Sequence, residues 1–285
     1  MRRGGGTHVA IQEHTRIQLA RGVRVFVRAP ETIQFGADAT RTGLITVPSA
    51  DEVVTVLDSL THPRMLKTVV AALAVHLGEA RARSLIDDLI TYRLLIPTTT
   101  PQVLVVGRDA LASQITLLLS RRGVVTRSPM KDESVSKFLL DHEPHLPVLA
   151  VNCAAEVDQI AAATRGRRGP VVPVTQFDAR VVVGPVCAPS GPCPVCARLY
   201  LLDRDPNIAQ VEEHLPPAIA AEPVSLAAGA VAAATVAGRL AGAPDPPGVS
   251  APTPVAGDVV VADPFAPVPV VSQRVPSHPD CPMCF

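Results

Sequence analysis

The sequence predicts an α/β protein built in two parts, a small module over residues 17–97 and a larger domain with a mostly parallel sheet over residues 102–285. Two features of the pattern indicate this division. Before residue 97, short segments of alternating apolar and polar residues precede segments with helical spacing; after residue 102, continuous apolar runs alternate with helical segments. Residues 98–101, Thr-Thr-Thr-Pro, are typical of a linker, and residues 1–16 are predicted to form a disordered arm.

Three short strands followed by three helices are expected in the first part. Period-two alternation predicts an antiparallel meander with strands over residues 23–28, 32–36 and 44–47. Apolar residues at helical spacing predict helices over residues 50–60, 66–77 and 79–92. Ser49 and Glu52 have the spacing of a capping box at the start of the first helix.

The second part alternates strands and helices. Residues 103–106 are all apolar and end at Gly107, which is typical of a parallel strand buried on both faces. Further strands are predicted over residues 124–125, 148–151, 171–174 and 181–185, and helices over residues 110–122 and 157–164. Residues 223–238 are mostly Ala and Gly and fall short of the roughly 18 residues of a membrane span, which favours a buried helix. Residues 242–257, rich in Pro, Gly and Ala, are predicted to be a flexible loop.

Composition excludes several classes of function. The 26 basic and 26 acidic residues balance, so nothing favours nucleic-acid binding, and the basic start lacks the apolar run of a secretory signal. No membrane association is expected, and the chain is predicted to be cytoplasmic. Six cysteines in such a chain favour metal or thiol chemistry over disulfides.

Four of these cysteines form two C-x-x-C pairs, Cys193 with Cys196 and Cys281 with Cys284. Two residues between thiols let both sulfur atoms reach one ion from a single turn, and two such pairs complete a tetrahedron with no open position. All-thiolate tetrahedral ligation favours a structural Zn²⁺. The alternatives are a redox pair at one C-x-x-C, or two unrelated pairs on the surface.

The other cysteines and the nearby histidines are secondary candidates. His278 could replace a thiolate, but with four cysteines present it is expected to support the site or to turn the chain. Cys153 and Cys187 are predicted to be small buried apolar residues. His142 and His145 are predicted to be exposed in a loop.

The turn after the strand at residues 103–106 is where a nucleotide-binding α/β domain carries G-x-G-x-x-G. Here the first glycine is Gly107, but Asp109 and Ala112 replace the second and third. The carboxylate of Asp109 would repel a phosphate and block close approach to the backbone. Residues 126–128 also lack the acidic residue expected after the next strand. The pattern disfavours ATP binding and indicates a degenerate nucleotide loop.

Three segments together resemble the leader-peptide-binding, zinc-containing cyclodehydratase partner proteins of azol(in)e peptide (TOMM) biosynthesis, a family of the ThiF-like, ubiquitin-activating-like superfamily. Residues 183–206 contain V-G-P, a proline, C-P-V-C and D-R-D-P, similar to the family's signature. Residues 278–284, H-P-D-C-P-M-C, are similar to its terminal H-P-x-C-x-x-C. The order of elements over residues 17–97 is similar to its winged-helix peptide-recognition module. The resemblance covers most of the chain, without residues 128–147 and 242–257.

The resemblance implies a non-catalytic scaffold. Its front module would capture the leader of a ribosomal precursor peptide as an added strand. A separate YcaO-type, ATP-dependent cyclodehydratase would then convert Cys, Ser or Thr of the peptide to azolines. The second part would be a degenerate Rossmann-like, adenylating-type domain with a zinc site, and the chain could form a homodimer. The residues expected to contact the peptide are Thr42, Leu44, Ile45, Thr46, Val47, Arg81, Leu85 and Leu89.

Some interpretations stay open at the level of sequence. Arg81, Arg83 and Arg93 could pair with an acidic leader, or they could form a solvated helix face. Two other functions compete with the scaffold: an adenylating transferase that activates a carboxylate with ATP, and a stand-alone regulator whose sheet binds another protein. The substitutions Asp109 and Ala112 favour the scaffold over the transferase.

Overall fold

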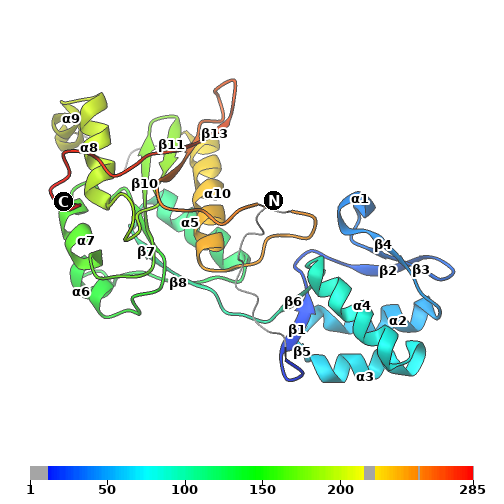
Figure 1. Cartoon of the computed structure of the whole chain (residues 1–285). Coiled ribbons are helices and arrows are strands. Elements are labelled where there is room, and N and C mark those ends of the chain that lie inside the picture. Colours follow the sequence, from blue (N-terminus) through cyan, green and yellow to red (C-terminus); the bar gives the residue numbers. More distant parts are fainter. Residues whose placement is uncertain (1–11, 215–221, 250, 285) are drawn as a thin grey trace. The chain divides into compact units, whose positions relative to one another are not determined.

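The computed structural model describes residues 12–214, 222–249 and 251–284 of the chain (Figure 1). The chain divides into two compact units: Met1–Thr99 with Pro244–Ala251, and Thr100–Ala243 with Pro252–Phe285. Most of the predicted arm, residues 1–11, lies outside the described residues, and Arg16 already belongs to the first strand.

The first unit contains the predicted meander, which is confirmed. Its strands are β2 (Val25–Ala29), β3 (Thr32–Phe35) and β4 (Leu44–Thr46). They pair antiparallel in the order β2-β3-β4, so β4 lies at an edge of the sheet. Phe35 and Ile33 point into the core and are fully buried, which explains the alternation seen in the sequence.

A second sheet in this unit was not predicted. It is formed by β1 (Arg16–Leu19), β5 (Arg64–Met65) and β6 (Leu95–Pro97), in the order β5-β1-β6. These strands are only two to four residues long, and each pairs with a segment far along the chain. Strands this short carry too little local pattern, because their stability comes from cross-strand packing.

The three predicted helices of this unit are confirmed. They are α2 (Ala50–Asp58), α3 (Leu66–Leu77) and α4 (Glu79–Thr91), with a short α1 (Ala39–Thr42) before β4 and a 3₁₀ turn, η1 (Ser59–Thr61), after α2. Leu57, Leu73 and Ile86 join them in one core with the strands. The predicted capping box is wrong: Ser49 has a left-handed φ of 54° and its side chain makes no capping hydrogen bond.

The second unit is built on one seven-stranded sheet, ordered β13-β12-β11-β10-β9-β7-β8. Its strands are β7 (Gln102–Val106), β8 (Val125–Arg127), β9 (Val148–Val151), β10 (Val171–Phe177), β11 (Arg180–Val183), β12 (Asp258–Ala262) and β13 (Val270–Arg274). The strands β10, β9, β7 and β8 run parallel, as predicted, and β11, β12 and β13 extend the sheet antiparallel. The α/β fold class expected from the sequence is confirmed.

Helices cover both faces of this sheet. They are α5 (Ala110–Arg121), α6 (Val135–Leu140), α7 (Val157–Thr164), α8 (Pro194–Arg204), α9 (Ile208–His214) and α10 (Pro223–Leu240). One core joins Val103 and Val105 of β7 to α5 and α10, whereas Leu104 and Val106 of the same strand pack with α6 and α7 on the opposite face. This two-sided burial explains why β7 is continuously apolar.

The predicted buried helix is α10, in which Ala230, Ala233 and Ala237 have no exposed surface. A side chain at Gly229 would lie 2.3 Å from Val181 Cγ2, so the small residues allow the helix to approach the sheet. By length and composition α10 could cross a membrane, but half of it is buried inside this unit, as in the core helix of a globular domain.

Candidate metal centre

The first C-x-x-C pair lies at the start of α8. Cys193 is the N-cap residue and Pro194 occupies the first turn, where a proline costs no hydrogen bond. One turn later Cys196 is completely buried. A helix start therefore places both thiols on the same side, as the two-residue spacing requires.

The second pair lies in the tail after β13, on a chain that folds back onto α8. The Cys281 amide donates to the His278 carbonyl at 3.1 Å, and the Cys284 amide donates to the Cys281 carbonyl at 3.3 Å. These consecutive turns hold Cys281 and Cys284 close together, and Cys281 is 1% exposed.

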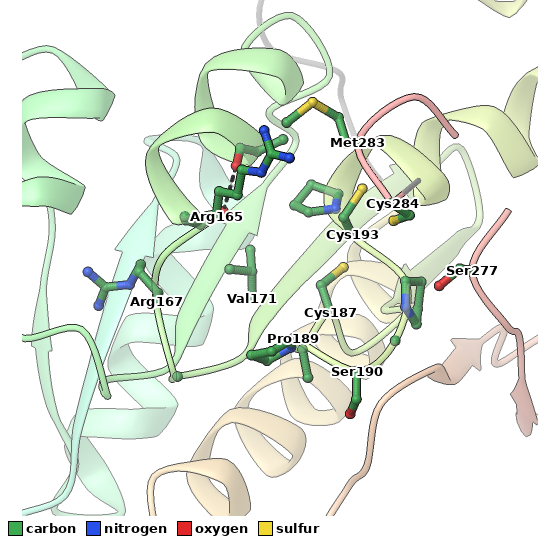
Figure 2. Close-up of a pocket in the computed structure, with 17 residues that line it drawn as sticks. Arg165, Arg167, Val171, Cys187, Pro189, Ser190, Cys193, Ser277, Met283 and Cys284 are labelled. Atoms are coloured by element: carbon green, nitrogen blue, oxygen red, sulfur yellow. Dashed lines mark hydrogen bonds between the residues drawn. The ribbon is translucent and has the colours of Figure 1, made fainter. Parts of the chain in front are cut away.

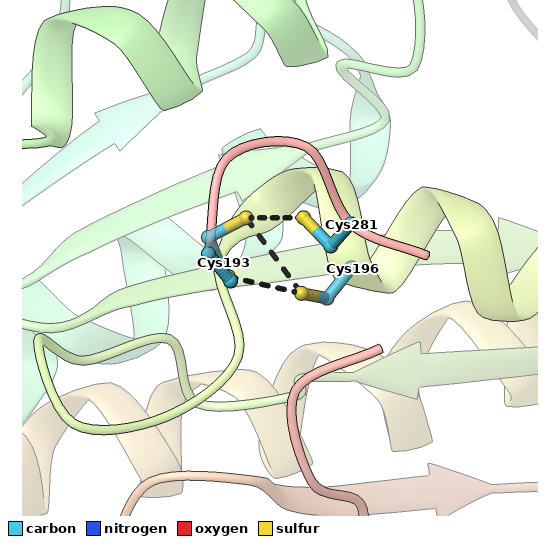
Figure 3. A group of neighbouring side chains, drawn as sticks. Cys193, Cys196 and Cys281 are labelled. Atoms are coloured by element: carbon cyan, nitrogen blue, oxygen red, sulfur yellow. Dashed lines mark hydrogen bonds between the residues drawn. The ribbon is translucent and has the colours of Figure 1, made fainter. Parts of the chain in front are cut away.

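The structure brings all four predicted thiols together, although Cys193 and Cys281 are 88 residues apart in the chain. Their Sγ atoms all lie within 4.8 Å of one another. Individual Sγ–Sγ distances are 3.7 Å for Cys193–Cys196, 3.5 Å for Cys193–Cys281 and 3.4 Å for Cys196–Cys284. In Figure 3 the sulfur atoms of Cys193, Cys196 and Cys281 point toward one another. We call these four residues the cysteine cluster.

These distances fit a tetrahedral zinc site. Zn–S bonds of about 2.3 Å place the sulfur atoms of a tetrahedron about 3.8 Å apart, close to the observed spacing. A disulfide needs an S–S distance of about 2.0 Å, and the four residues are free cysteines. The convergence also excludes two unrelated surface pairs.

The electrostatics of the cluster favour a bound cation. Burial raises the pKa of the Cys193 thiol, and contact with Cys281 and Cys284 adds to that shift. Burial likewise raises the pKa of Cys284. Burial acts in the same direction on Cys196, but hydrogen bonds, led by the His278 amide, bring its pKa below the usual value. Four thiolates in one buried place repel each other, and a divalent cation removes that cost.

His278 supports the cluster and is not one of its ligands. Its amide donates to Cys196 Sγ at 3.4 Å, and its ring accepts from the Asp280 amide at Nδ1, at 3.1 Å. The Nε2 atom lies 2.8 Å from Asp203 Oδ2, and the ring packs edge-on against Tyr200, with 4.8 Å between centroids. Because both ring nitrogens are engaged and the residue is 2% exposed, His278 fixes the tail against α8.

The contact between Asp203 and His278 was missed from the sequence, because the two residues are 75 positions apart. Both belong to the segments that carry the family resemblance, D-R-D-P and H-P-x-C-x-x-C. The presence of both segments in the resemblance was the sequence signal for a contact between Asp203 and His278.

We expect His278→Ala to weaken Zn²⁺ binding about 10- to 100-fold, the usual effect of removing a group that orients metal ligands. The substitution removes the ring contacts with Asp203, Asp280 and Tyr200 while leaving all four thiols in place. Competition with a chromogenic chelator measures the affinity. His145→Ala, at an exposed position outside the cluster, is the matched control, and equal affinities of the two variants would contradict the assigned role.

A pocket of about 450 Å³ adjoins the cysteine cluster (Figure 2). It is lined in part by Cys187, Cys193 and Cys284, and by Arg165 and Arg167. Cys187 is 3% exposed, as predicted for a small buried residue, and burial holds its pKa far above the usual value. It lies outside the group of four converging thiols.

The remaining secondary candidates stand apart from the cluster. Cys153 is partly buried, and burial raises the pKa of its thiol to about 12. His145 is exposed as predicted, whereas His142 is partly buried, with its Nδ1 atom 2.7 Å from the Phe138 carbonyl.

The turn that the sequence predicts to be a degenerate nucleotide loop lies at the start of α5. Gly107 has a φ of 132°, and a Cβ there would lie 2.7 Å from the Val151 carbonyl, so the close approach to β9 requires glycine. Asp109 is the N-cap of α5 and accepts from the Ala112 amide at 2.8 Å. The carboxylate therefore occupies the position where a helix N-terminus would bind a phosphate.

The residues expected to contact a peptide fall into two groups. Leu44, Ile45 and Thr46 form β4, with Thr42 just before them at the end of α1 and Val47 just after them.

The other three lie on α4. Arg81 is exposed, whereas Leu85 and Leu89 belong to the core of the first unit and are 9% and 2% exposed. Of these three side chains, Arg81 is therefore at the surface, and the two leucines pack beneath the helix.

Comparisons with known proteins show which solved structures have a similar fold. No protein-family model matches the chain, and no curated protein matches it in sequence. Among solved structures, a chain of the E. coli microcin synthetase McbBCD complex with pro-MccB17 bound is similar over 94% of this chain and 99% of its own, with a TM-score of 0.64 and 14% identity.

Two heterocyclase structures are also similar. One, in complex with substrate and cofactor, has a TM-score of 0.57 and 17% identity over 95% of this chain; the other, TruD, has a TM-score of 0.56 and 16% identity over 95%. This chain spans 39% and 43% of those two proteins. At such identities the similarity shows the fold alone: the chain has the mixed α/β architecture found in these heterocyclase and microcin synthetase chains.

Proposed function

We propose that this protein is a zinc-binding, non-catalytic scaffold that captures the leader of a ribosomal precursor peptide and presents it to a YcaO-type cyclodehydratase. The observation that carries the proposal is the convergence of four thiols from α8 and the tail, within a fold similar over nearly its whole length to a chain of a peptide-bound microcin synthetase complex. Zinc bound by Cys193, Cys196, Cys281 and Cys284 is structural, since four thiolates leave no position for a reacting water.

The leader is expected to add as a strand to the free edge of β4, in the manner of a winged-helix recognition module. The Phe35 amide donates to the Gly43 carbonyl, and the Val47 amide donates to the Glu31 carbonyl, so the backbones of Gly43, Ile45 and Val47 face β3. Because alternate residues of a strand face opposite sides, the amides and carbonyls of Leu44 and Thr46 point outward. These are the groups that a leader strand would bond.

Exposed side chains of this unit suit an amphipathic peptide. Leu44 is 47% exposed, so its side chain offers apolar surface beside the free backbone groups. Arg81 is exposed on α4, whereas Arg83 is 3.5 Å from Glu13 and Arg93 donates to the Val249 carbonyl at 3.3 Å. Of the three arginines considered for an acidic leader, Arg81 is therefore the one we assign to it.

We expect Thr46→Pro to weaken leader binding about 10-fold or more, because it removes an outward amide donor without removing a bond to β3. Proline is tolerated in an edge strand when its nitrogen faces solvent. Thr46→Ala keeps the amide, removes only the side chain, and should bind like the parent. Titration of each full-length variant with leaders encoded by neighbouring precursor-like genes measures the leader affinity.

Equal binding of Thr46→Pro and the parent would rule out strand addition at β4. Absence of saturable binding by every neighbouring precursor leader would contradict leader capture itself.

The ATP-dependent chemistry is proposed to belong to the partner enzyme. Asp109 caps α5 with its own carboxylate, which disfavours a nucleotide phosphate at this loop. Two further measurements follow: co-purification with a YcaO-type partner, and ATP–pyrophosphate exchange by the isolated chain. Exchange above background would replace the scaffold with the alternative, an adenylating transferase. A cytoplasmic location and a homodimer are also part of the proposal.

A further inference from the structure

A short segment after α10 belongs to the first unit and not to the unit of its neighbours in the chain. Residues 244–249 follow α10 and precede β12, which are elements of the second unit, but they group with residues 1–99. Their sequence, Pro-Asp-Pro-Pro-Gly-Val, contains three prolines, which restrict the backbone. The Val249 amide donates to the Pro246 carbonyl at 3.2 Å, so the segment ends in a closed turn. We call residues 244–249 the strap.

The strap packs on the backbone just before β4. Gly248 has a φ of 72°, and a Cβ there would lie 2.7 Å from the Arg41 carbonyl oxygen and 2.9 Å from Arg41 Cβ. A side chain has no room at such distances from backbone atoms, so the contact requires glycine. Arg41 belongs to α1, which ends at Thr42, and Gly43 alone separates α1 from β4. The strap therefore lies against the start of the strand that is proposed to bind the leader.

The next residue of the strap contacts the turn after α4. The Arg93 guanidinium group donates to the Val249 carbonyl at 3.3 Å, and Arg93 lies two residues beyond the end of α4. Gly248 and Val249 are neighbours in the chain. Two consecutive residues of the strap thus join the segment before β4 to the segment after α4.

The two segments that the strap joins belong to different parts of the first unit. α1 packs on β3, in the sheet that ends at β4, whereas α4 packs on α3 and on β6 of the other sheet. The leader is proposed to meet both parts, through the edge of β4 and through Arg81 of α4. A shift of one part relative to the other would move one set of leader contacts away from the other set.

We propose that the strap holds β4 and α4 in the arrangement that binds the leader, so that leader recognition depends on residues outside the module predicted over residues 17–97. This inference rests on the proposed function and assigns Gly248 and Arg93 to it as positioning residues. The strap does not cover the leader-binding edge, since Leu44 of β4 is 47% exposed. A bridge that is in place before the peptide arrives strengthens binding, because less ordering is left to occur on binding.

The first test measures the affinity of full-length glycine variants for leaders encoded by neighbouring precursor-like genes. Gly248→Ala forces a Cβ into the contact with Arg41 and should weaken leader binding at least about 5-fold. Gly242→Ala is the matched control: residue 242 has a φ of 76°, so alanine carries the same backbone strain there, but its Cβ has nothing within 4 Å. The control should bind within about 2-fold of the parent. Equal affinities of the two variants would overturn the proposal.

Arg93→Met separates positioning from direct contact with the leader. It removes the donor to the Val249 carbonyl and keeps a long side chain. Because Arg93 acts through the strap, its replacement should weaken leader binding in the parent but add less than about 2-fold to the effect of Gly248→Ala. The same loss in both backgrounds would show that Arg93 binds the leader itself, and its positioning role would be wrong.

Hydrogen exchange tests the bridge without a leader. Exchange at the amides of Thr42 and Gly43, which close the turn of α1, should be faster in Gly248→Ala than in the parent and unchanged in Gly242→Ala. If no neighbouring leader binds the parent, leader capture fails, and exchange alone then decides whether the strap holds this segment. Exchange in Gly248→Ala at the rate of the parent would overturn the bridge.

Discussion

Replacing Cys281 and Cys284 with serine is expected to remove the bound zinc and to lower the free energy of unfolding of the second unit by about 4 kcal/mol when free zinc is 1,000 times its dissociation constant. The two remaining thiols, Cys193 and Cys196, cannot complete a tetrahedral site. Metal binding then no longer stabilises the folded state, because the free energy of binding is also free energy of folding. Elemental analysis gives the stoichiometry, expected to fall from one equivalent of zinc to none, and urea titration gives the stability.

The matched control for this double variant is Cys153→Ser, which removes a thiol that is partly buried but lies outside the cysteine cluster. It should keep one equivalent of zinc. Removing zinc from the parent with a chelator should reproduce the instability of the double variant. If the metal-free parent unfolds at the same urea concentration as the zinc-loaded protein, the structural role is disproved.

The position of the cluster in the chain decides what the metal would hold together. Cys193 and Cys281 are 88 residues apart, so one bound ion would join the tail to the start of α8 in the folded state. The tail is otherwise held by a few contacts, among them the bond from the Tyr200 hydroxyl to the Pro276 carbonyl at 3.1 Å and the pairing of His278 with Asp203. Without the metal these contacts alone must hold the tail on α8.

The convergence of the four cysteines was predictable because their signal is local. The spacing of a C-x-x-C pair indicates that both of its thiols can reach one ion. Two such pairs in one chain therefore indicate a shared site with four thiols. His278 was expected to support the site or to turn the chain, but its partner Asp203 was not identified from the sequence. The contact of His278 with Asp203 depends on how the tail returns to α8, and nothing near either residue in the sequence specifies that path.

The family resemblance, and not the residue pattern, assigned Leu85 and Leu89 to a peptide. Residues three or four apart share a helix face, but the pattern does not say whether that face meets the core or a ligand. In the structure these two leucines meet the core, and the exposed part of α4 is its charged face.

Three elements of the second unit, α8, β12 and β13, were also not predicted, because the local residue pattern does not specify how distant segments pack. The start of α8 was interpreted as part of a metal-binding turn because two residues separate Cys193 from Cys196, although Pro194 is favoured in the first turn of a helix. The strands β12 and β13 follow a Pro-rich segment and pair with each other, and β12 also pairs with β11. That pairing is a property of the whole sheet, so local pattern could not predict it.

Arg167→Met is expected to destabilise the second unit by about 3 kcal/mol, although no motif marks this residue. Its guanidinium group donates to four backbone carbonyls, those of Leu139, His142, Glu143 and Leu146, at 2.6 to 3.3 Å. Arg167 is 6% exposed, and burial lowers the pKa of its guanidinium group.

Methionine fills much of the same volume but leaves those carbonyls without their donor, and unsatisfied buried acceptors account for most of the loss. Arg168→Met is the matched control, because the neighbouring Arg168 is exposed and its replacement should change the stability by less than about 0.5 kcal/mol. Urea unfolding followed by circular dichroism compares the two variants. A similar, small loss in both would show that the loop over residues 139–146 holds its shape without Arg167. A large loss confined to Arg167→Met would show that this one cation joins α6, its following loop and the start of β10 into the face of the sheet beside the cysteine cluster.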